Sequence, residues 1–153
     1  MDYDVWGTWT PSGVGPNAPL NDTCAPTSEQ EGSAVKAVAS WIAAKFPASQ
    51  IVLGVASYGH SFSVSPSAAI DGSTGQMAAY PPFDASNQPH GDAWDADAGV
   101  DQCGNPTPVG GIWDFWGLVQ GGFLTSGGTP ETGIDYRFDT CSQTVSTFFI
   151  FTE

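Results

Sequence analysis

Two short stretches of the sequence bring together side chains that are suited to chemistry. Residues 92–99 read DAWDADAG, a D-x-x-D-x-D spacing that gathers carboxylates for acid–base catalysis or for a hard cation. Residues 1–9 read MDYDVWGTW, where a phenol, a carboxylate and two indoles follow one another. A phenol donates and a carboxylate accepts hydrogen bonds, while an indole face offers a flat apolar surface. The carboxylate spacing makes residues 92–99 the first candidate site to consider.

The neighbours of residues 92–99 argue against catalysis there. Pro89, Gly91 and Gly99 bound the stretch, whereas a buried strand that positions a catalytic carboxylate is rich in apolar, β-branched residues. The EF-hand pattern is not met, because no glutamate follows at the required distance. A calcium loop stays open as the alternative, since four hard oxygen ligands are available: Asp92, Asp95, Asp97 and Asp101. The sequence favours an acidic surface loop.

The first 60 residues predict the elements that position residues 1–9. Residues 1–6 read as the end of a short strand, and the proline- and glycine-rich residues 7–27 as turns. Residues 50–59, QIVLGVASYG, form a continuous apolar run typical of a strand buried on both faces of a parallel sheet. With a helix between them, these segments form one βαβ unit.

The helix of that unit has clear end signals. Ser28 or Ser33 can cap its first turn, and Pro47 ends it. An apolar stripe at helical spacing predicts packing against a core: Val35, Val38, Ala39, Ile42 and Phe46.

The second part of the chain changes character. Residues 63–111 are dominated by Ser, Pro, Gly, Asp and Asn and show no long periodic pattern. Residues 110–124 predict either a short aromatic strand or one helical turn between glycines. Residues 134–139, IDYRFD, alternate like a strand.

Composition and charge exclude several classes of partner. Three basic residues against sixteen acidic ones give a net charge of −13, so phosphate backbones and anionic membranes are poor ligands. No apolar run approaches the roughly 20 residues of a membrane span, and the first residues lack the regions of a signal peptide. Few lysines with many tryptophans, hydroxyls and amides favour a secreted protein that handles neutral polymers. The sequon Asn21-Asp22-Thr23 agrees with secretion.

Several stretches together resemble the glycoside hydrolase family 18 chitinases, especially the secreted fungal members. Residues 1–9 resemble the M-x-Y-D motif at the end of barrel strand six, and GPNAPL at residues 15–20 continues the match. IVLGVASYGHSF at residues 51–62 resembles the strand-seven motif. Residues 111–124 and 136–144 resemble the small insertion that follows strand seven.

The resemblance implies an α/β fold: part of a (β/α)₈ barrel, with strands six and seven and the helix between them, plus a small α+β insertion domain. Such barrels need ~250 residues, so the chain is expected to be a fragment from the C-terminal half. Residues 1–62 would be the barrel segment, 63–144 the insertion and 145–153 an off-pattern tail.

The family's chemistry is substrate-assisted: the acetamido oxygen of N-acetylglucosamine attacks while a glutamate protonates the leaving oxygen. Tyr3 and Asp4 match the residues that hold and polarise the acetamido group. Met1 would line the same pocket, and Trp9 matches a stacking platform. No metal or cofactor is implied. The matching positions in the strand-seven motif are Tyr58 and His60.

Two departures from the family put activity in doubt. His60 stands where the family usually has arginine, and an imidazole lacks the fixed fork of a guanidinium. The general acid belongs to a D-x-x-D-x-D-x-E motif that should precede residue 1, and in residues 92–99 Gly99 takes the place of that glutamate. The chain is expected to be inactive alone. The sequence favours the truncated product of a longer chitinase gene, and a non-catalytic chitin-binding protein is the alternative.

The expected partners follow from the resemblance: chitin or N-acetylglucosamine oligosaccharides, with no nucleic acid and no membrane, in the extracellular space. The three cysteines are odd in number and lack zinc-ligand spacing. Because Cys103 and Cys141 both fall in the insertion, they are the expected disulfide, which leaves Cys24 over.

Overall fold

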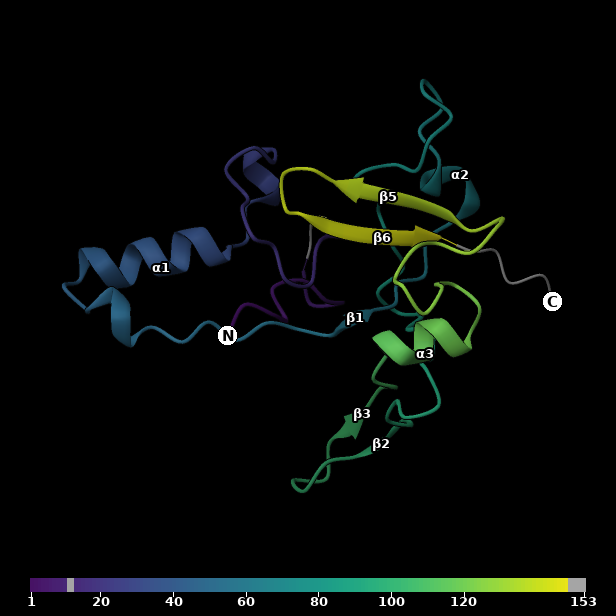
Figure 1. The fold of residues 1–153 in the computed structure, drawn as a ribbon. Coiled ribbons are helices and arrows are strands. Elements are labelled where there is room, and N and C mark those ends of the chain that lie inside the picture. The colour runs from purple at the N-terminus through teal and green to yellow at the C-terminus, as the bar shows by residue number, and fades with distance from the viewer. Residues whose placement is uncertain (11–12, 149–153) are drawn as a thin grey trace.

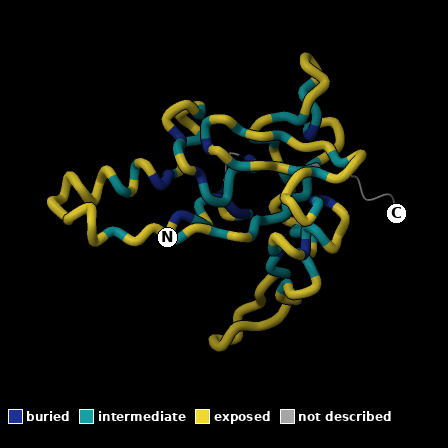
Figure 2. Tube along the Cα trace, in the orientation of Figure 1, coloured by how far each residue is buried: buried dark blue, intermediate teal, exposed yellow. Residues whose placement is uncertain are grey.

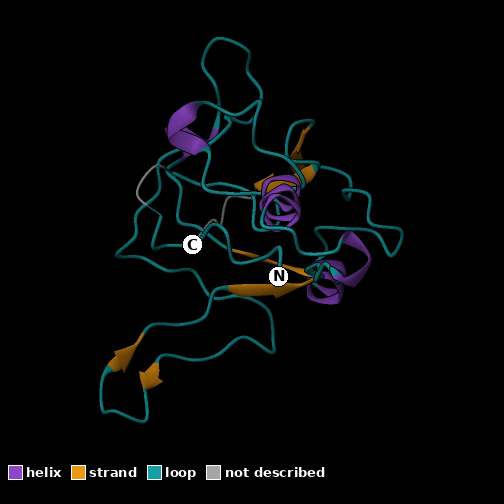
Figure 3. Cartoon of the chain, turned by 90° about the vertical axis from the view of Figure 1, so that its left-hand side faces the viewer, coloured by secondary structure: helices purple, strands orange, loops and turns teal. Residues whose placement is uncertain are grey.

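A computed structural model describes residues 1–10 and 13–148 (Figure 1). Short helices and strands alternate with long loops, and the strands lie in separate pairs (Figure 3). The helical elements are η1 Thr27–Glu29, α1 Ala34–Ala43, η2 Ala48–Gln50, α2 Pro66–Ala69 and α3 Phe115–Gln120. The strands are β1 Tyr58–His60, β2 Gly99–Val100, β3 Pro106–Thr107, β4 Ile112–Asp114, β5 Asp135–Asp139 and β6 Thr144–Phe148.

Three antiparallel pairs, β1·β4, β2·β3 and β5·β6, make up the described sheets. The first pair matters for the site, because it places Tyr58 opposite Asp114 and His60 opposite Ile112. The hairpin β2·β3 extends away from α3 (Figure 1). A single parallel bridge joins Asp2 to Val55, the only parallel pairing in the described part of the chain.

Helix α1 confirms one of the two predicted caps. The Ser33 hydroxyl accepts a hydrogen bond from the Lys36 N–H at 3.4 Å, and the helix ends at Ala43, three residues before Phe46. The predicted packing of its apolar stripe is wrong for this chain, since most of the stripe is exposed (Figure 2). The stripe instead forms a shallow apolar groove with Leu20 and Leu53.

The expected buried strand at residues 50–59 is also wrong. Only Tyr58–His60 is a strand, and Val52 and Val55 are 91% and 75% exposed. A strand buried on both faces needs neighbours on both sides. Among the described residues, residues 50–57 form one β-bridge, to Asp2, and the Phe115 N–H donates to the Ser57 carbonyl at 2.9 Å, so no continuous strand lies on either side.

The aromatic segment 110–124 contains both predicted forms, because strand β4 runs directly into helix α3. Trp113 is half-buried with its ring edge-on to Phe123, at 5.1 Å between centroids. Strand β5 confirms the alternation at 134–139, and its partner β6 continues to Phe148. The predicted tail begins inside β6, and its last residues, 149–153, lie outside the described part.

The expected disulfide is wrong. Cys24 and Cys141 are bonded, with their Cα atoms 5.8 Å apart, and Cys103 is free and exposed. Cys103 lies in the turn between β2 and β3, away from the rest of the chain, whereas the turn between β5 and β6 meets the loop before η1. A disulfide needs its two Cα atoms within about 7 Å. Cys24 and Cys141 meet this condition although they are far apart in the sequence.

Candidate functional site

Asp4 is the centre of the candidate site. The Tyr58 hydroxyl donates to Asp4 Oδ1 at 2.6 Å, and His60 Nε2 lies 3.0 Å from the same oxygen. An ionised carboxylate can only accept, so Nε2 carries the proton in this pair. No described residue donates to the second oxygen, Asp4 Oδ2, and half of the Asp4 side chain is exposed. One carboxylate oxygen is thus fixed while the other is open to a ligand.

Asn17 fixes the backbone around this pair. Its Oδ1 accepts from the Asp4 N–H at 2.9 Å, and its Nδ2 donates to the Tyr58 carbonyl at 3.0 Å. Asp4 itself has φ +57°, in the left-handed region that aspartate tolerates better than most residues. Sequence reasoning missed Asn17. Its position within GPNAPL, residues 15–20, which resemble the family, could have indicated it.

The electrostatics favour a permanent carboxylate at this point. The hydrogen bond from Tyr58, helped by His60, lowers the pKa of Asp4 in spite of some desolvation. Desolvation, with the neighbouring Asp4 carboxylate, raises the pKa of Tyr58 to about 12. Asp4 is therefore ionised and Tyr58 protonated across the ordinary pH range.

The aromatic residues of the site surround this pair. The rings of Tyr3 and Tyr58 meet edge to face at 6.1 Å, and Trp9 stands edge-on to His60 at 5.6 Å. Trp9 is 61% exposed, so much of its indole is open to solvent. Met1 is also exposed and lies with Tyr3 beside Gly54. The structure thus brings four predicted residues together around Asp4, namely Tyr3, Trp9, Tyr58 and His60, whereas the contact shown for Met1 is with Gly54.

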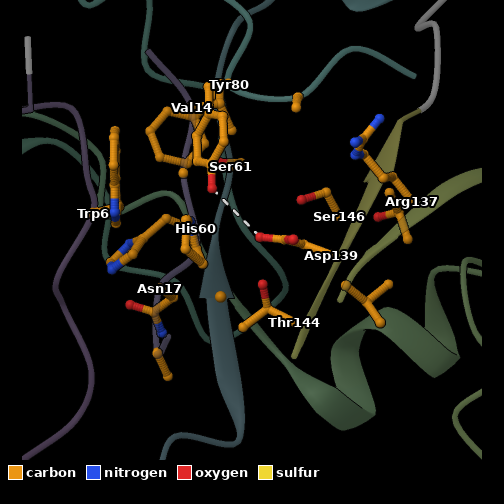
Figure 4. A pocket seen from close by; sticks show the side chains of 18 of the residues that line it. Trp6, Val14, Asn17, His60, Ser61, Tyr80, Arg137, Asp139, Thr144 and Ser146 are labelled. Atoms are coloured by element: carbon orange, nitrogen blue, oxygen red, sulfur yellow. Dashed lines mark hydrogen bonds between the residues drawn. The ribbon is translucent and has the colours of Figure 1, made fainter. Parts of the chain in front are cut away.

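A cavity of about 1190 Å³ lies beside strand β1 (Figure 4). Asn17, His60 and Trp6 line it on one side and Asp139 on the other, with Tyr80 at its top between them (Figure 4). The Tyr80 hydroxyl donates to Asp139 at 3.4 Å. Asn17, Tyr58 and His60 are among the described residues that line it, so the cavity shares a wall with the candidate site.

Residues 92–99 are a structural loop. The carboxylates of Asp92 and Asp95 accept hydrogen bonds from backbone N–H groups. The described residues contain no cluster of His, Cys, Asp or Glu suited to a metal ion. Nor does any described helix have the length and hydropathy to cross a bilayer.

Comparison with known proteins decides the family. Residues 1–120, which include every residue of the candidate site, match Glycosyl hydrolases family 18. The chain belongs to this family. The resemblance seen in its motifs is thereby confirmed.

Two relatives of this family 18 chain come from Moniliophthora. A protein named "chitinase-like effector" from Moniliophthora roreri is 57% identical over 145 residues, which are 94% of this chain and 35% of that protein. One of the same name from Moniliophthora perniciosa is 55% identical over 142 residues, 93% of this chain and 32% of that protein.

A solved structure shows the same fold. The crystal structure of a chitinase from Rhizomucor miehei superposes with a TM-score of 0.77 at 30% identity, over 97% of this family 18 chain and 37% of that chitinase. The chain therefore spans about a third of the length of the relatives that it matches.

Proposed function

We propose that the chain recognises the N-acetyl group of β-1,4-linked N-acetylglucosamine polymers, as the acetamido-binding part of a chitinase-like site. The Asp4 carboxylate carries this proposal: Tyr58 and His60 hold one oxygen, no described residue bonds the other, and the side chain is half exposed. An open carboxylate oxygen suits an amide N–H, and a phenol hydroxyl suits the amide carbonyl. An acetamido group offers both partners at once.

Each residue of the site has a part in this proposal. Asp4 accepts from the acetamido N–H, and Tyr3 donates to its carbonyl oxygen. Trp9 offers its exposed indole to the C–H face of a sugar ring, and Met1 contributes apolar contact. His60 positions Asp4, because its Nε2 donates to Asp4 Oδ1 at 3.0 Å and its side chain is largely buried.

The proposed chemistry stops at binding and polarisation. In the substrate-assisted scheme the acetamido oxygen attacks the anomeric carbon, and Tyr3 and Asp4 would orient it. These 153 residues contain no D-x-x-D-x-D-x-E motif to protonate the leaving oxygen. General acid catalysis commonly contributes 10²–10⁴-fold. The chain by itself is therefore expected to bind without hydrolysis.

The second candidate differs in the whole protein to which the chain corresponds: a non-catalytic chitin-binding protein in place of a chitinase. The name of the two Moniliophthora relatives, "chitinase-like effector", favours it, since that name sets them apart from chitinases. A secreted location fits both candidates. It is supported by the Cys24–Cys141 disulfide, because such bonds persist in oxidising compartments.

We further propose that residues 1–62 supply barrel strands six and seven, with residues 63–144 as the insertion. The parallel bridge from Asp2 to Val55 supports neighbouring parallel strands. The exposed apolar faces of α1 and of residues 50–57 would then pack against further barrel elements, of which the longer relatives have room for several.

Calorimetry with the hexamer of N-acetylglucosamine tests the site. Asp4→Asn should weaken binding roughly tenfold or more, since it removes a charged acceptor. Asp84→Asn is the matched control, because Asp84 also accepts a side-chain hydroxyl at 2.6 Å, from Ser86, but is far from Asp4 in the chain. Equal affinity of both variants would contradict the proposal. Release of reducing sugar by the wild-type chain would contradict binding without hydrolysis.

A further inference from the structure

Asp95 ties the loop of residues 91–97 to strand β4. Its Oδ2 accepts from the N–H groups of Gly91 and Gly111 at 2.8 Å each, and its Oδ1 accepts from that of Ile112 at 3.1 Å. Although partial burial opposes ionisation, these backbone donors lower the pKa of Asp95. A carboxylate with three fixed backbone donors makes a rigid anchor.

Asp92 makes a second anchor, at the junction of β4 and α3. Its Oδ2 accepts from the Asp114 N–H at 2.8 Å, and its Oδ1 accepts from the Trp94 N–H at 2.8 Å. Gly117 leaves room for this carboxylate, since a Cβ there would clash with it. The two acids thus fix the backbone that carries Trp94.

The anchored loop presents an aromatic pair to solvent. Trp94 is 75% exposed, the most exposed of the six tryptophans. Its ring meets that of Trp116 at 6.2 Å between centroids and 70° between planes. Trp116, on α3, is also exposed. A large apolar side chain held in water on a rigid loop is the kind of exposure that indicates a binding surface.

The aromatic pair is connected to the candidate site through the same strand pair. Tyr58, which holds Asp4, lies opposite Asp114 in the β1·β4 register. The Asp114 N–H in turn donates to Asp92, the anchor of Trp94. The β1·β4 pair thus joins the strand that holds Asp4 to the strand that anchors the loop of Trp94.

The charge of the loop and the small area of the two indoles indicate which kind of ligand the Trp94–Trp116 pair could bind. The loop is acidic in a chain of net charge −13, so anionic polymers are repelled. Two indoles bury roughly 150–250 Å² each, whereas a stable protein interface needs roughly 1,000 Å². A neutral polymer whose rings stack singly on aromatic faces satisfies both conditions.

We propose that Trp94 and Trp116 form an accessory stacking platform for pyranose rings of an N-acetylglucosamine polymer, outside the Asp4 site. The identity of the polymer rests on the proposed function; the platform itself rests on the exposed, anchored indoles. The acids of residues 92–99 then serve recognition indirectly, as anchors of Trp94.

Calorimetry of the full chain with the dimer and the hexamer of N-acetylglucosamine tests the platform. Trp94→Ala should weaken hexamer binding about tenfold, as expected for a lost aromatic surface, and leave dimer binding unchanged. Trp94→Phe should restore much of the hexamer affinity. Trp41→Ala is the matched control, because Trp41 is exposed on α1 and also meets one aromatic ring edge-on.

The outcomes separate the platform from the Asp4 site. An unchanged hexamer affinity in Trp94→Ala, with Asp4→Asn still weakening both ligands, overturns the platform and keeps the proposed function. Residual hexamer binding in Asp4→Asn that Trp94→Ala abolishes supports the platform even if the dimer does not bind. Equal losses for dimer and hexamer, no binding of either by the wild-type chain, or a Trp94-dependent dimer of the protein in sedimentation overturns the platform.

Discussion

At the scale of single residues, the candidate site depends on two donors that share one oxygen of Asp4. Tyr58 supplies the shorter hydrogen bond and is the largest cause of the lowered pKa of Asp4. Because the carboxylate is the form that accepts from an acetamido N–H, ligand binding should persist above that lowered pKa and be lost as the pH falls through it. His60 offers Asp4 one donor. The arginine that the family resemblance implies at this position would present a guanidinium with several donors in a fixed geometry.

Removing the Tyr58 hydroxyl should therefore raise the pKa of Asp4 towards its ordinary value of 3.8. The variant Tyr58→Phe keeps the ring against Tyr3 and removes only the donor. Carboxyl ¹³C chemical shifts followed through an acid titration measure this pKa, and binding should be lost at a higher pH than in the wild type. The control is Tyr136→Phe, an exposed tyrosine on β5. An unchanged Asp4 titration in Tyr58→Phe would show that the hydrogen bond does not control the carboxylate.

At the scale of elements, local signals were predictable from the sequence and non-local ones were not. The Ser33 cap and strand β5 depend on neighbours a few residues away, and both are confirmed. The strand expected at residues 50–59 depends on pairing partners distant in the chain, and the prediction fails where the described residues supply none. The disulfide prediction failed for a similar reason, since the bonded cysteines, Cys24 and Cys141, are 117 residues apart in the chain.

The site was predictable only in part, and through resemblance. The motif positions of Tyr3, Asp4 and Tyr58 converge as expected, although no periodicity links residues more than 50 positions apart. Asn17 was missed, because an amide in a turn has no signal of its own until its partners are known. The prediction of an acidic loop at residues 92–99 did not include the hydrogen bonds of Asp92 and Asp95 to the backbone at and before β4, because those partners lie far along the chain.

The loop anchored by Asp95 gives the prediction at this scale. Asp95→Ala removes the acceptor of three backbone N–H groups, and it should lower the free energy of unfolding by roughly 2 kcal/mol. Native-state hydrogen exchange should be faster at Gly111 and Ile112, whose donors lose their partner. Asp97→Ala, in the same loop and exposed, is the control. Unaltered protection at both amides would refute the anchoring role of Asp95.

At the scale of the whole molecule, the chain exposes more surface than a compact domain of its mass. Its accessible area is 9590 Å², whereas a compact monomer of this mass exposes roughly 7,400 Å². Few apolar side chains are buried, with Trp6 at 1% exposed the largest, while the apolar faces of α1 and of residues 50–57 are open. Coverage of about a third of its relatives fits this picture. The Cys24–Cys141 bond closes most of the chain into one loop and offsets part of the missing core.

The proposed function requires that the chain recognise the acetamido group through the open oxygen of Asp4. The direct measurement compares calorimetric binding of the hexamer of N-acetylglucosamine with that of the β-1,4-linked glucose hexamer, which has the same backbone and no acetamido group. We expect the first to bind at least roughly tenfold more tightly, the value of one charge-assisted hydrogen bond, and the difference to vanish in Asp4→Asn. Equal affinities of the wild-type chain for the two hexamers, or no binding of either, would contradict the claim.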